Sequence, residues 1–289
     1  MPSTRQLKLR IRSVKSTKQI TKAMQLVAAS KMRRAQEADK ASAPYTRAAT
    51  SLLANLAAHG ATADHPLFQQ REVKTRLLIV IASDKGLVGA YNANVLKAYV
   101  RELREDDAKG IKNETVAVGR KASQFVTRLK DTTISGVYEH LPDQPSGVQL
   151  RAIYDTALDK FTNGDVDAVD VVYTEFLSSI NQQSKVQRIL PAGVGVSEPE
   201  TVNREALYEP DAQTVLDGIT RRLVEAQIFQ GLLDAKASEY SMQMVAMKNA
   251  TDNASDLVDD LTVAMNKLRQ GAITQELAEI SGGVEALAE

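Results

Sequence analysis

The chain has 289 residues, with 36 Lys and Arg against 36 Asp and Glu, and it contains no cysteine and no tryptophan. The absence of cysteine excludes disulfides, thiolate metal sites and cysteine nucleophiles, and the three histidines all lie in predicted loops, which disfavours a multi-histidine metal site. No apolar run approaches the roughly 18 residues that a membrane span needs, and an aromatic content of 4% disfavours stacking platforms for single-stranded nucleic acid.

The balanced total charge conceals two oppositely charged ends. Residues 1–58 contain 12 Lys and Arg but 2 Asp and Glu, whereas residues 211–289 contain 6 and 13. Opposite charges attract, so we expect the two ends to meet. The first 36 residues have ten basic and no acidic side chains, which is also typical of a transit peptide. The helical pattern continues past residue 50 without a break, and this disfavours that alternative.

Residues 3–58 are predicted to form one long helix, which Ser3 or Thr4 is suited to cap. Pro44 is expected to kink or interrupt this helix, because proline has no N–H to donate. Apolar side chains recur three and four positions apart, with Lys and Arg between them. These apolar positions are Leu7, Ile11, Val14, Ile20, Met24 and Val27.

Residues 74–200 change to a pattern of alternating strands and helices. Short apolar or β-branched runs predict strands at 77–82, 115–119, 132–137 and 169–177, and amphipathic stretches predict helices at about 90–104, 121–130 and 148–161. Residues 185–190 are predicted to pair with the last strand as a hairpin. This alternation favours a Rossmann-like α/β layer with a mostly parallel sheet.

Residues 211–286 carry the strongest pattern in the chain. Alternating steps of three and four residues from Leu216 to Ala272 give 17 positions, of which only Gln230 and Thr251 are not apolar. A 3.5-residue repeat sustained over eight heptads predicts a coiled-coil seam, about 85 Å long at the rise of an α-helix. The sequence has no proline after Pro210 that would break the helix.

These segments define the predicted fold, which is α/β with long helices. We expect an antiparallel coiled coil between an N-terminal helix (1–58) and a C-terminal helix (211–289), with an α/β domain and its flanking loops (59–210) between them. Because the C-terminal helix is the longer one by about twenty residues, its tail should extend beyond the paired region.

The sequence contains no catalytic constellation that we can identify, and it predicts neither a cofactor nor a metal. Residues 83–89 follow a strand and precede a helix, as a phosphate loop does, but they lack the spacing of either common nucleotide motif. We expect their glycines to permit a tight turn and close packing. Residues 193–195 are interpreted as a loop, and the acidic pairs at 106–107 and 259–260 as solvated helix faces.

Four sequence blocks resemble the ATP synthase gamma subunit family, in the same order as in that family. They are residues 11–17 with 20–33, residues 83–89 with Asn92, residues 244–253, and residues 273–280. The blocks span essentially the whole chain. One departure is Val284 after Gly283, where the family usually has alanine. The cysteine-bearing insertion of the chloroplast form is absent, so the resemblance is to bacterial members.

The resemblance implies a central-stalk rotor that couples ion-driven rotation of the c-ring to ATP synthesis or hydrolysis at the beta subunits. Such a rotor performs no bond chemistry of its own. The implied partners are the alpha and beta subunits of the hexamer, the epsilon subunit and the c-ring, with no nucleic acid. The implied location is peripheral, on the cytoplasmic side of the cell membrane.

The family motifs also imply two contact regions. The residues expected to contact beta subunits are Met24, Arg33, Arg34, Arg269, Gln270, Thr274 and Glu276. Tyr208 and Glu209, which precede the C-terminal helix, are expected at the end that meets the c-ring and the epsilon subunit. The alternatives are that Met24 is ordinary seam packing, that the arginines form a solvated face, and that Tyr208 only precedes a helix start.

Two other classes of protein stay open from the sequence. A nucleotide-binding enzyme with a coiled-coil dimerisation arm would need a phosphate loop, and a nucleotide titration would distinguish it. A coiled-coil nucleic-acid binder would use the basic first 36 residues and show a steep salt dependence of DNA affinity. The acidic C-terminal segment argues against the second class, because it is expected to cover part of that basic surface.

Overall fold

The computed structural model describes residues 3–58, 62, 65–130, 132–143, 145, 147–192, 209 and 211–288. The chain divides into two compact units. Met1–Val27 and Met244–Glu289 form the coiled-coil unit, and Ala28–Gln243 forms the sheet unit. Two long helices, α1 (Thr4–Ala58) and α5 (Ala212–Ala288), contribute residues to both units. Among the described helices, none has both the length and the apolar character needed to cross a membrane.

The sheet unit contains a five-stranded sheet of order β3-β2-β1-β4-β5. Its strands are β1 (Thr75–Ile81), β2 (Lys112–Val118), β3 (Thr133–Tyr138), β4 (Ala168–Phe176) and β5 (Gln182–Leu190). Strands β1 to β4 are parallel, and β5 is antiparallel to β4, so the predicted parallel layer and the hairpin are confirmed. The shorter helices are α2 (Tyr91–Ala108), α3 (Arg120–Val126) and α4 (Gly147–Thr162), with a 3-10 turn η1 at Pro66–Phe68.

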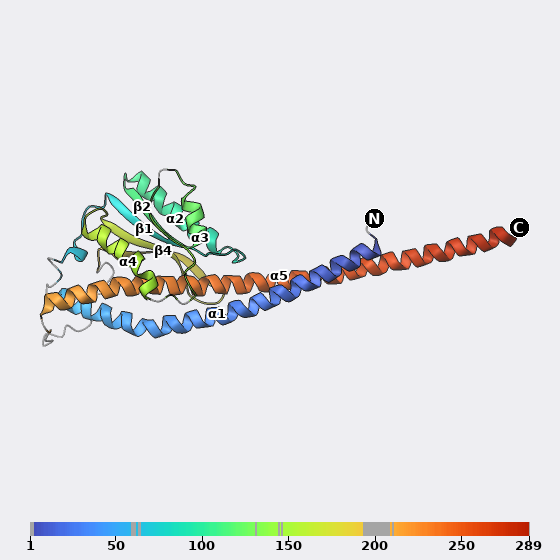
Figure 1. The fold of residues 1–289 in the computed structure, drawn as a ribbon, viewed down its shortest axis with the longest axis horizontal. Coiled ribbons are helices and arrows are strands. Elements are labelled where there is room, and N and C mark those ends of the chain that lie inside the picture. Colours follow the sequence, from blue (N-terminus) through green and yellow to red (C-terminus); the bar gives the residue numbers. More distant parts are fainter. Residues whose placement is uncertain are drawn as a thin grey trace. The chain divides into compact units, whose positions relative to one another are not determined.

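Helices cover both faces of the sheet (Figure 1). On one face, Phe161 of α4 and Ile228 of α5 belong to the same core as Ile79 of β1. On the other face, Tyr99 of α2 packs in a core with Leu78 of β1. Strand β1 is therefore buried on both sides, which is why its sequence is a continuous apolar run instead of an alternating one.

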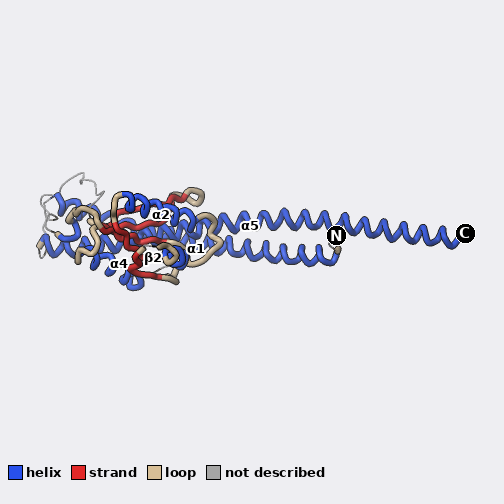
Figure 2. The backbone as a smooth tube through the Cα atoms, turned by 90° about the horizontal axis from the view of Figure 1, so that it is seen from above, coloured by secondary structure: helices blue, strands red, loops and turns tan. Residues whose placement is uncertain are grey.

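In the coiled-coil unit, α1 and α5 lie side by side and antiparallel (Figure 2). The hydroxyl oxygens of Thr21 and Thr251 are 2.8 Å apart and both side chains are buried. Lys18 Nζ donates to Ser255 Oγ at 2.9 Å, which continues the same register. Thr251 is one of the two polar positions of the predicted seam. Its polar side chain is therefore paired with the polar side chain of Thr21 on the opposite helix.

The two long helices also pack together within the sheet unit. Leu56 of α1 and Leu216 of α5 belong to one buried cluster. Gln230, the other polar seam position, hydrogen-bonds the carboxylate of Asp39 in α1. The structure thus confirms the predicted fold class, an antiparallel coiled coil with a Rossmann-like α/β domain. Both polar interruptions of the seam have a polar partner on the opposite helix.

Two sequence expectations about α1 need correction. Ile20 and Val27 are 57% and 55% exposed, so they lie outside the seam, which instead takes Thr21 and Ala28. Counting only apolar residues missed the register because Thr21 is polar. Pro44 does not interrupt α1, which runs through it to Ala58. One missing N–H is tolerated because packing against α5, as at Leu56, holds the flanking turns.

The ends of the helices follow capping rules. The Gln6 N–H donates to Ser3 Oγ at 3.3 Å, and the Ser3 N–H donates to Gln6 Oε1 at 3.0 Å, a reciprocal capping box. This confirms Ser3 as the cap of α1. At the start of α5, Asp211 Oδ1 accepts the Thr214 N–H at 2.8 Å.

Candidate functional site

The predicted contact residues Arg33 and Arg34 lie on the exposed surface of α1. Arg33 Nε is 3.1 Å from Glu37 Oε1, an ion pair between two solvated side chains. Such pairs add little stability, so both guanidinium groups stay able to reach a partner. Lys31 differs from them, because its ammonium is 2.7 Å from Asp143 Oδ2 and is committed to the fold of the sheet unit.

Met24 lies at the edge of the seam in the coiled-coil unit. It is half-buried and follows Thr21 by about one helical turn. Seam packing therefore uses only part of its surface. The flexible thioether of methionine adapts to surfaces of irregular shape, and the exposed part of Met24 is available to a partner.

The last described part of α5 makes no packing contact that buries it. Residues 269–281 are all exposed, and these include the predicted contact residues Arg269, Gln270, Thr274 and Glu276. Thr274 Oγ1 donates to the Gln270 carbonyl at 2.9 Å, a bond within the helix itself. Three apolar side chains are exposed among these polar ones, namely Ile273, Leu277 and Ile280 at 49%, 62% and 65%. Exposed apolar side chains repeated along a helix indicate a partner surface.

The predicted contact residues form separate groups. Because Thr21 pairs with Thr251, Met24 lies opposite the part of α5 about one turn before Thr251. Arg269 comes 18 residues after Thr251, which is roughly 27 Å along a helix. Arg33 and Arg34 belong to the sheet unit. Glu209 is exposed, whereas Tyr208 and residues 193–195 lie outside the described residues.

The loop between β1 and α2 is held by its own polar groups. The Ser83 N–H donates to Asn92 Oδ1 at 3.0 Å. Asp84 Oδ1 accepts the N–H of Arg120, the first residue of α3, at 2.9 Å, and that of His140 at 3.1 Å. The Asp84 carboxylate thus caps α3, whereas the helix that follows this loop is α2. A negative charge within the loop would repel a phosphate group, which disfavours a nucleotide site there.

The glycines near this loop have different roles. Gly89 has φ of 57°, which the predicted tight turn requires. At Gly86 a Cβ would meet no atom within 4 Å, so close packing does not require glycine there. The close approach is instead at Gly119, where a Cβ would lie 2.1 Å from the Ala82 carbonyl oxygen.

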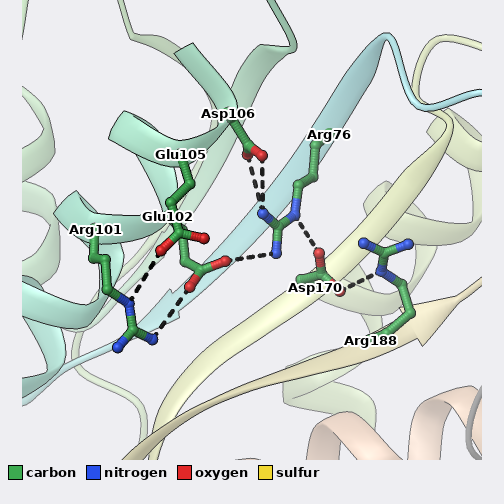
Figure 3. A network of polar contacts seen from close by, with 7 residues as sticks. All are labelled: Arg76, Arg101, Glu102, Glu105, Asp106, Asp170 and Arg188. Carbon is green, nitrogen blue, oxygen red and sulfur yellow. Dashed lines mark hydrogen bonds and ion pairs between the residues drawn. The ribbon is translucent and has the colours of Figure 1, made fainter. Parts of the chain in front are cut away.

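A buried ionic network in the sheet unit was not predicted (Figure 3). The guanidinium of Arg76, at the start of β1, contacts carboxylates of Asp106 and Glu102 on α2 at 3.0 and 3.1 Å, and also that of Asp170 on β4. Arg188 on β5 contacts Asp170 from the other side. Asp106 is 3% exposed, so the expectation that the 106–107 pair is solvated is wrong for Asp106.

The network ties α2 to three strands. Burial alone would lower the pKa of Arg76, but the charges of Asp170 and Asp106 outweigh it and raise that pKa. The buried guanidinium of Arg76 is therefore paired with carboxylates on α2 and β4. We assign the network a structural role, because its charged side chains pair with one another and so hold α2 against the sheet. Sequence alone could not find it, since β1, α2 and β4 meet only in the fold.

A second set of carboxylates lies where α1, α5 and the β4–β5 hairpin meet. Burial, with the charges of Asp39 and Glu175, raises the pKa of Asp234 to about 7, and Lys185 offsets this only in part. Lys185 Nζ is 2.6 Å from Glu175 Oε1, so Lys185 forms its ion pair with Glu175 and not with Asp234. Asp234 is thus an acid that the fold leaves without a cation of its own.

The described residues contain no group of three or more metal-binding side chains. What the structure offers instead is two long helices with exposed basic, polar and apolar side chains, and a sheet unit whose buried ionic network joins α2 to the sheet. This arrangement suits a structural subunit that contacts other proteins.

Comparison with known proteins agrees with this class. A family model described as ATP synthase matches residues 3–287. The chain is 41% identical to the ATP synthase gamma chain of Ralstonia nicotianae, covering 99% of this chain and all of that one, and 41% identical to that of Pelotomaculum thermopropionicum with the same coverage.

Solved structures show the same likeness. The central stalk and c-ring structure of the Tetrahymena thermophila mitochondrial ATP synthase contains a chain with a TM-score of 0.63 and 25% identity, covering 80% of this chain and 99% of that one. A chain of the Euglena gracilis mitochondrial enzyme, 19% identical, shares the fold with a TM-score of 0.70, covering 98% and 94%. The protein belongs to the ATP synthase gamma chain family, the rotor subunits of the central stalk.

Proposed function

We propose that the chain transmits rotation between a membrane-embedded ion-driven c-ring and the catalytic beta subunits of an F-type ATP synthase. The observation that carries this proposal is the uncovered end of α5, residues 269–281, in a chain that matches gamma chains over its full length. A helix end with repeated exposed apolar side chains needs a surrounding partner. The hexamer of alpha and beta subunits is the partner proposed here.

The residues proposed to contact beta subunits are Met24, Arg33, Arg34, Arg269, Gln270, Thr274 and Glu276. Exposure of the arginines supports this assignment. Rotation requires contacts that change smoothly with angle. Solvated charges interact over about a Debye length, roughly 8–10 Å in physiological salt, whereas interdigitated apolar contacts are lost within an ångström or so. Exposed arginines facing an acidic segment of each beta subunit fit that requirement.

The other end of the rotor is proposed to contact the c-ring and the epsilon subunit through Tyr208 and Glu209. The chain is then a peripheral protein on the cytoplasmic side of the cell membrane, attached through the complex. Glu209 is exposed, as this role requires.

The first experiment is affinity purification of the tagged chain from detergent-solubilised membranes of its host, followed by an ATPase assay. Co-purification of alpha and beta subunits with ATPase activity is the expected result. A chain that is recovered without other subunits and without ATPase activity would contradict the rotor assignment.

The second experiment tests the arginines in the assembled enzyme. Charge reversal of Arg33 and Arg34 to Glu should lower ATP-driven ion pumping severalfold relative to ATP hydrolysis in inverted vesicles. The matched control reverses Arg128 and Lys130, which are also exposed but lie just after α3. Equal pumping in both double variants would remove Arg33 and Arg34 from the proposed contact.

A further inference from the structure

A cavity of about 710 Å³ lies within the sheet unit between α1, α4 and α5. This volume is in the range of small-molecule sites, about 300–1,000 Å³. Two glycines, Gly147 at the start of α4 and Gly218 on α5, line it, and a Cβ at either would meet no atom within 4 Å. The cavity therefore has open space beside both helices, and close packing does not account for the glycines.

The cavity has an aromatic wall that carries a hydroxyl group. Tyr154 of α4 and Phe229 of α5 line it, and Tyr45 of α1 is exposed at its edge. Tyr154 is 3% exposed, and its hydroxyl forms no hydrogen bond with another described residue. A hydroxyl in the lining of a cavity can donate to a ligand there.

Among the described residues, the charged groups that line the cavity lie on α5. Arg221, Arg222 and Glu225 line it. Arg221 is 3.9 Å from Asp155 of α4, a loose pair, whereas Arg222 forms no ion pair with a described residue. One acidic group on a ligand would be attracted by Arg222, and a second would be repelled by Glu225. The charge pattern favours a ligand with a single negative charge.

The geometry points to a binding site for a small amphipathic anion in this cavity. Its apolar body covers Tyr154 and Phe229, its acidic group lies at Arg222, and the Tyr154 hydroxyl donates to an acceptor on its body. The chemistry required is an aromatic or alicyclic skeleton with one carboxylate or sulfonate. This site is independent of the proposed rotor contacts and of whether the chain is part of an ATP synthase.

The test uses the full chain and the fluorescent probe 8-anilinonaphthalene-1-sulfonate, whose shape and charge match the proposed class. We expect one saturable component of binding that depends on the cavity, in addition to binding at the exposed apolar faces. Gly218→Leu, which places a side chain in the open space, should lower the affinity about tenfold or more, and Arg222→Glu should lower it about tenfold. The uncharged analogue N-phenyl-1-naphthylamine should bind the wild-type chain more weakly and be unaffected by Arg222→Glu.

The matched control is Gly271→Leu, the same change on the same helix, at a position that also has open space but does not line the cavity. This control separates the cavity from the exposed apolar faces, which bind the probe as well. Far-UV circular dichroism and the melting temperature show that each variant is folded, and Arg222→Glu tests the site even if Gly218→Leu unfolds. Equal binding in Gly218→Leu, Arg222→Glu and Gly271→Leu would overturn the proposal. Displacement of the probe by a stoichiometric partner subunit would also overturn it and assign the cavity to a protein contact.

Discussion

Two stretches of α5 differ in how much of their surface the chain itself covers. Among residues 231–241, only Asp234 is not buried, whereas residues 269–281 are exposed throughout. The first stretch contacts the sheet. A Cβ placed on Gly231 would lie 3.7 Å from the ring of Tyr173, and Ser238 Oγ donates to the Thr174 carbonyl at 3.1 Å. The second stretch has only its own helical bonds.

The contrast separates two uses of one helix. In the first stretch, every side of α5 contributes to the free energy of folding, so substitutions there should act on stability. In the second stretch only the helix propensity of a residue affects stability, because no side chain is buried. Substitutions that keep the helix should therefore change assembly and coupling and leave stability unchanged. Measurements on both stretches, ordered by expected effect, test this division.

The largest effect is expected at the buried ion pair of Lys236 and Glu239, whose charged atoms are 3.3 Å apart. Burial raises the pKa of Glu239, and Lys236 only partly offsets this. Lys236→Ala leaves a buried carboxylate without its cation and should lower the free energy of unfolding by about 3 kcal/mol at pH 8. Chemical denaturation measures this.

The control is Lys267→Ala, the same change at an exposed position of α5, which should cost about 0.5 kcal/mol or less. Adding Glu239→Gln to Lys236→Ala should recover part of the loss, because no charge is then buried. Equal losses for Lys236→Ala and Lys267→Ala would show that the two stretches do not differ in the way proposed.

The next effect is a pH dependence from Asp234. Its pKa of about 7 in the folded chain lies above the ordinary 3.8, so the folded state binds the proton more tightly than the unfolded state. The stability that this provides is fully present below about pH 4 and is lost as the pH rises through 7. Asp234→Asn should therefore raise the stability at pH 8 by on the order of 2 kcal/mol relative to wild type, allowing for partial exposure.

The measurement is the melting temperature of both proteins from pH 5 to pH 8. The difference between Asp234→Asn and wild type should grow over this window. Asp260→Asn, an exposed carboxylate on the same helix, should show no such trend. A melting-temperature difference that stays constant from pH 5 to pH 8 would mean that the Asp234 carboxylate is solvated and that its pKa is not raised.

Local patterns and the opposite charges of the two ends predicted the elements and the pairing of the two long helices, but not the individual contacts between distant residues. The 3.5-residue repeat of α5 and the apolar run of β1 depend on neighbours in sequence, so both could be recognised. The network around Arg76 could not, because its carboxylates come from α2 and β4. Ile20 was assigned to the seam because an exposed apolar residue and a seam residue look alike until the partner helix is placed.

The candidate site follows the same division. Family motifs named the contact residues, and their exposure agrees with a surface role, but no motif distinguished Lys31, which pairs with Asp143, from its neighbours Arg33 and Arg34. The length of the C-terminal helix predicted a tail beyond the paired region. The structure adds that Ile273, Leu277 and Ile280 on this part of α5 are exposed.

A smaller effect is expected from the buried hydroxyl pair of Thr21 and Thr251. Thr21→Val or Thr251→Val alone leaves one buried hydroxyl with a poorer partner and should cost about 1 kcal/mol. The double variant replaces both by apolar groups of the same shape, and should lose less than the sum of the single losses. A double-mutant cycle from denaturation measures the coupling. Additive losses would mean that the pair does not contribute to the register of the seam.

The smallest effect on stability is expected from removing the exposed end of α5. A chain that ends at Leu268 should have a free energy of unfolding within about 0.5 kcal/mol of that of the full chain, because residues 269–281 are exposed throughout. The same truncation should strongly reduce assembly or coupled ATPase activity with alpha and beta subunits.

The full-length variant with Ile273, Leu277 and Ile280 changed to Ser keeps the helix but removes its exposed apolar face. It should be as stable as wild type and impaired in the same assay. A truncated chain that is destabilised by several kcal/mol would mean that the end of α5 serves the fold of the chain. A truncated chain with full coupling would instead remove this surface from the proposed function.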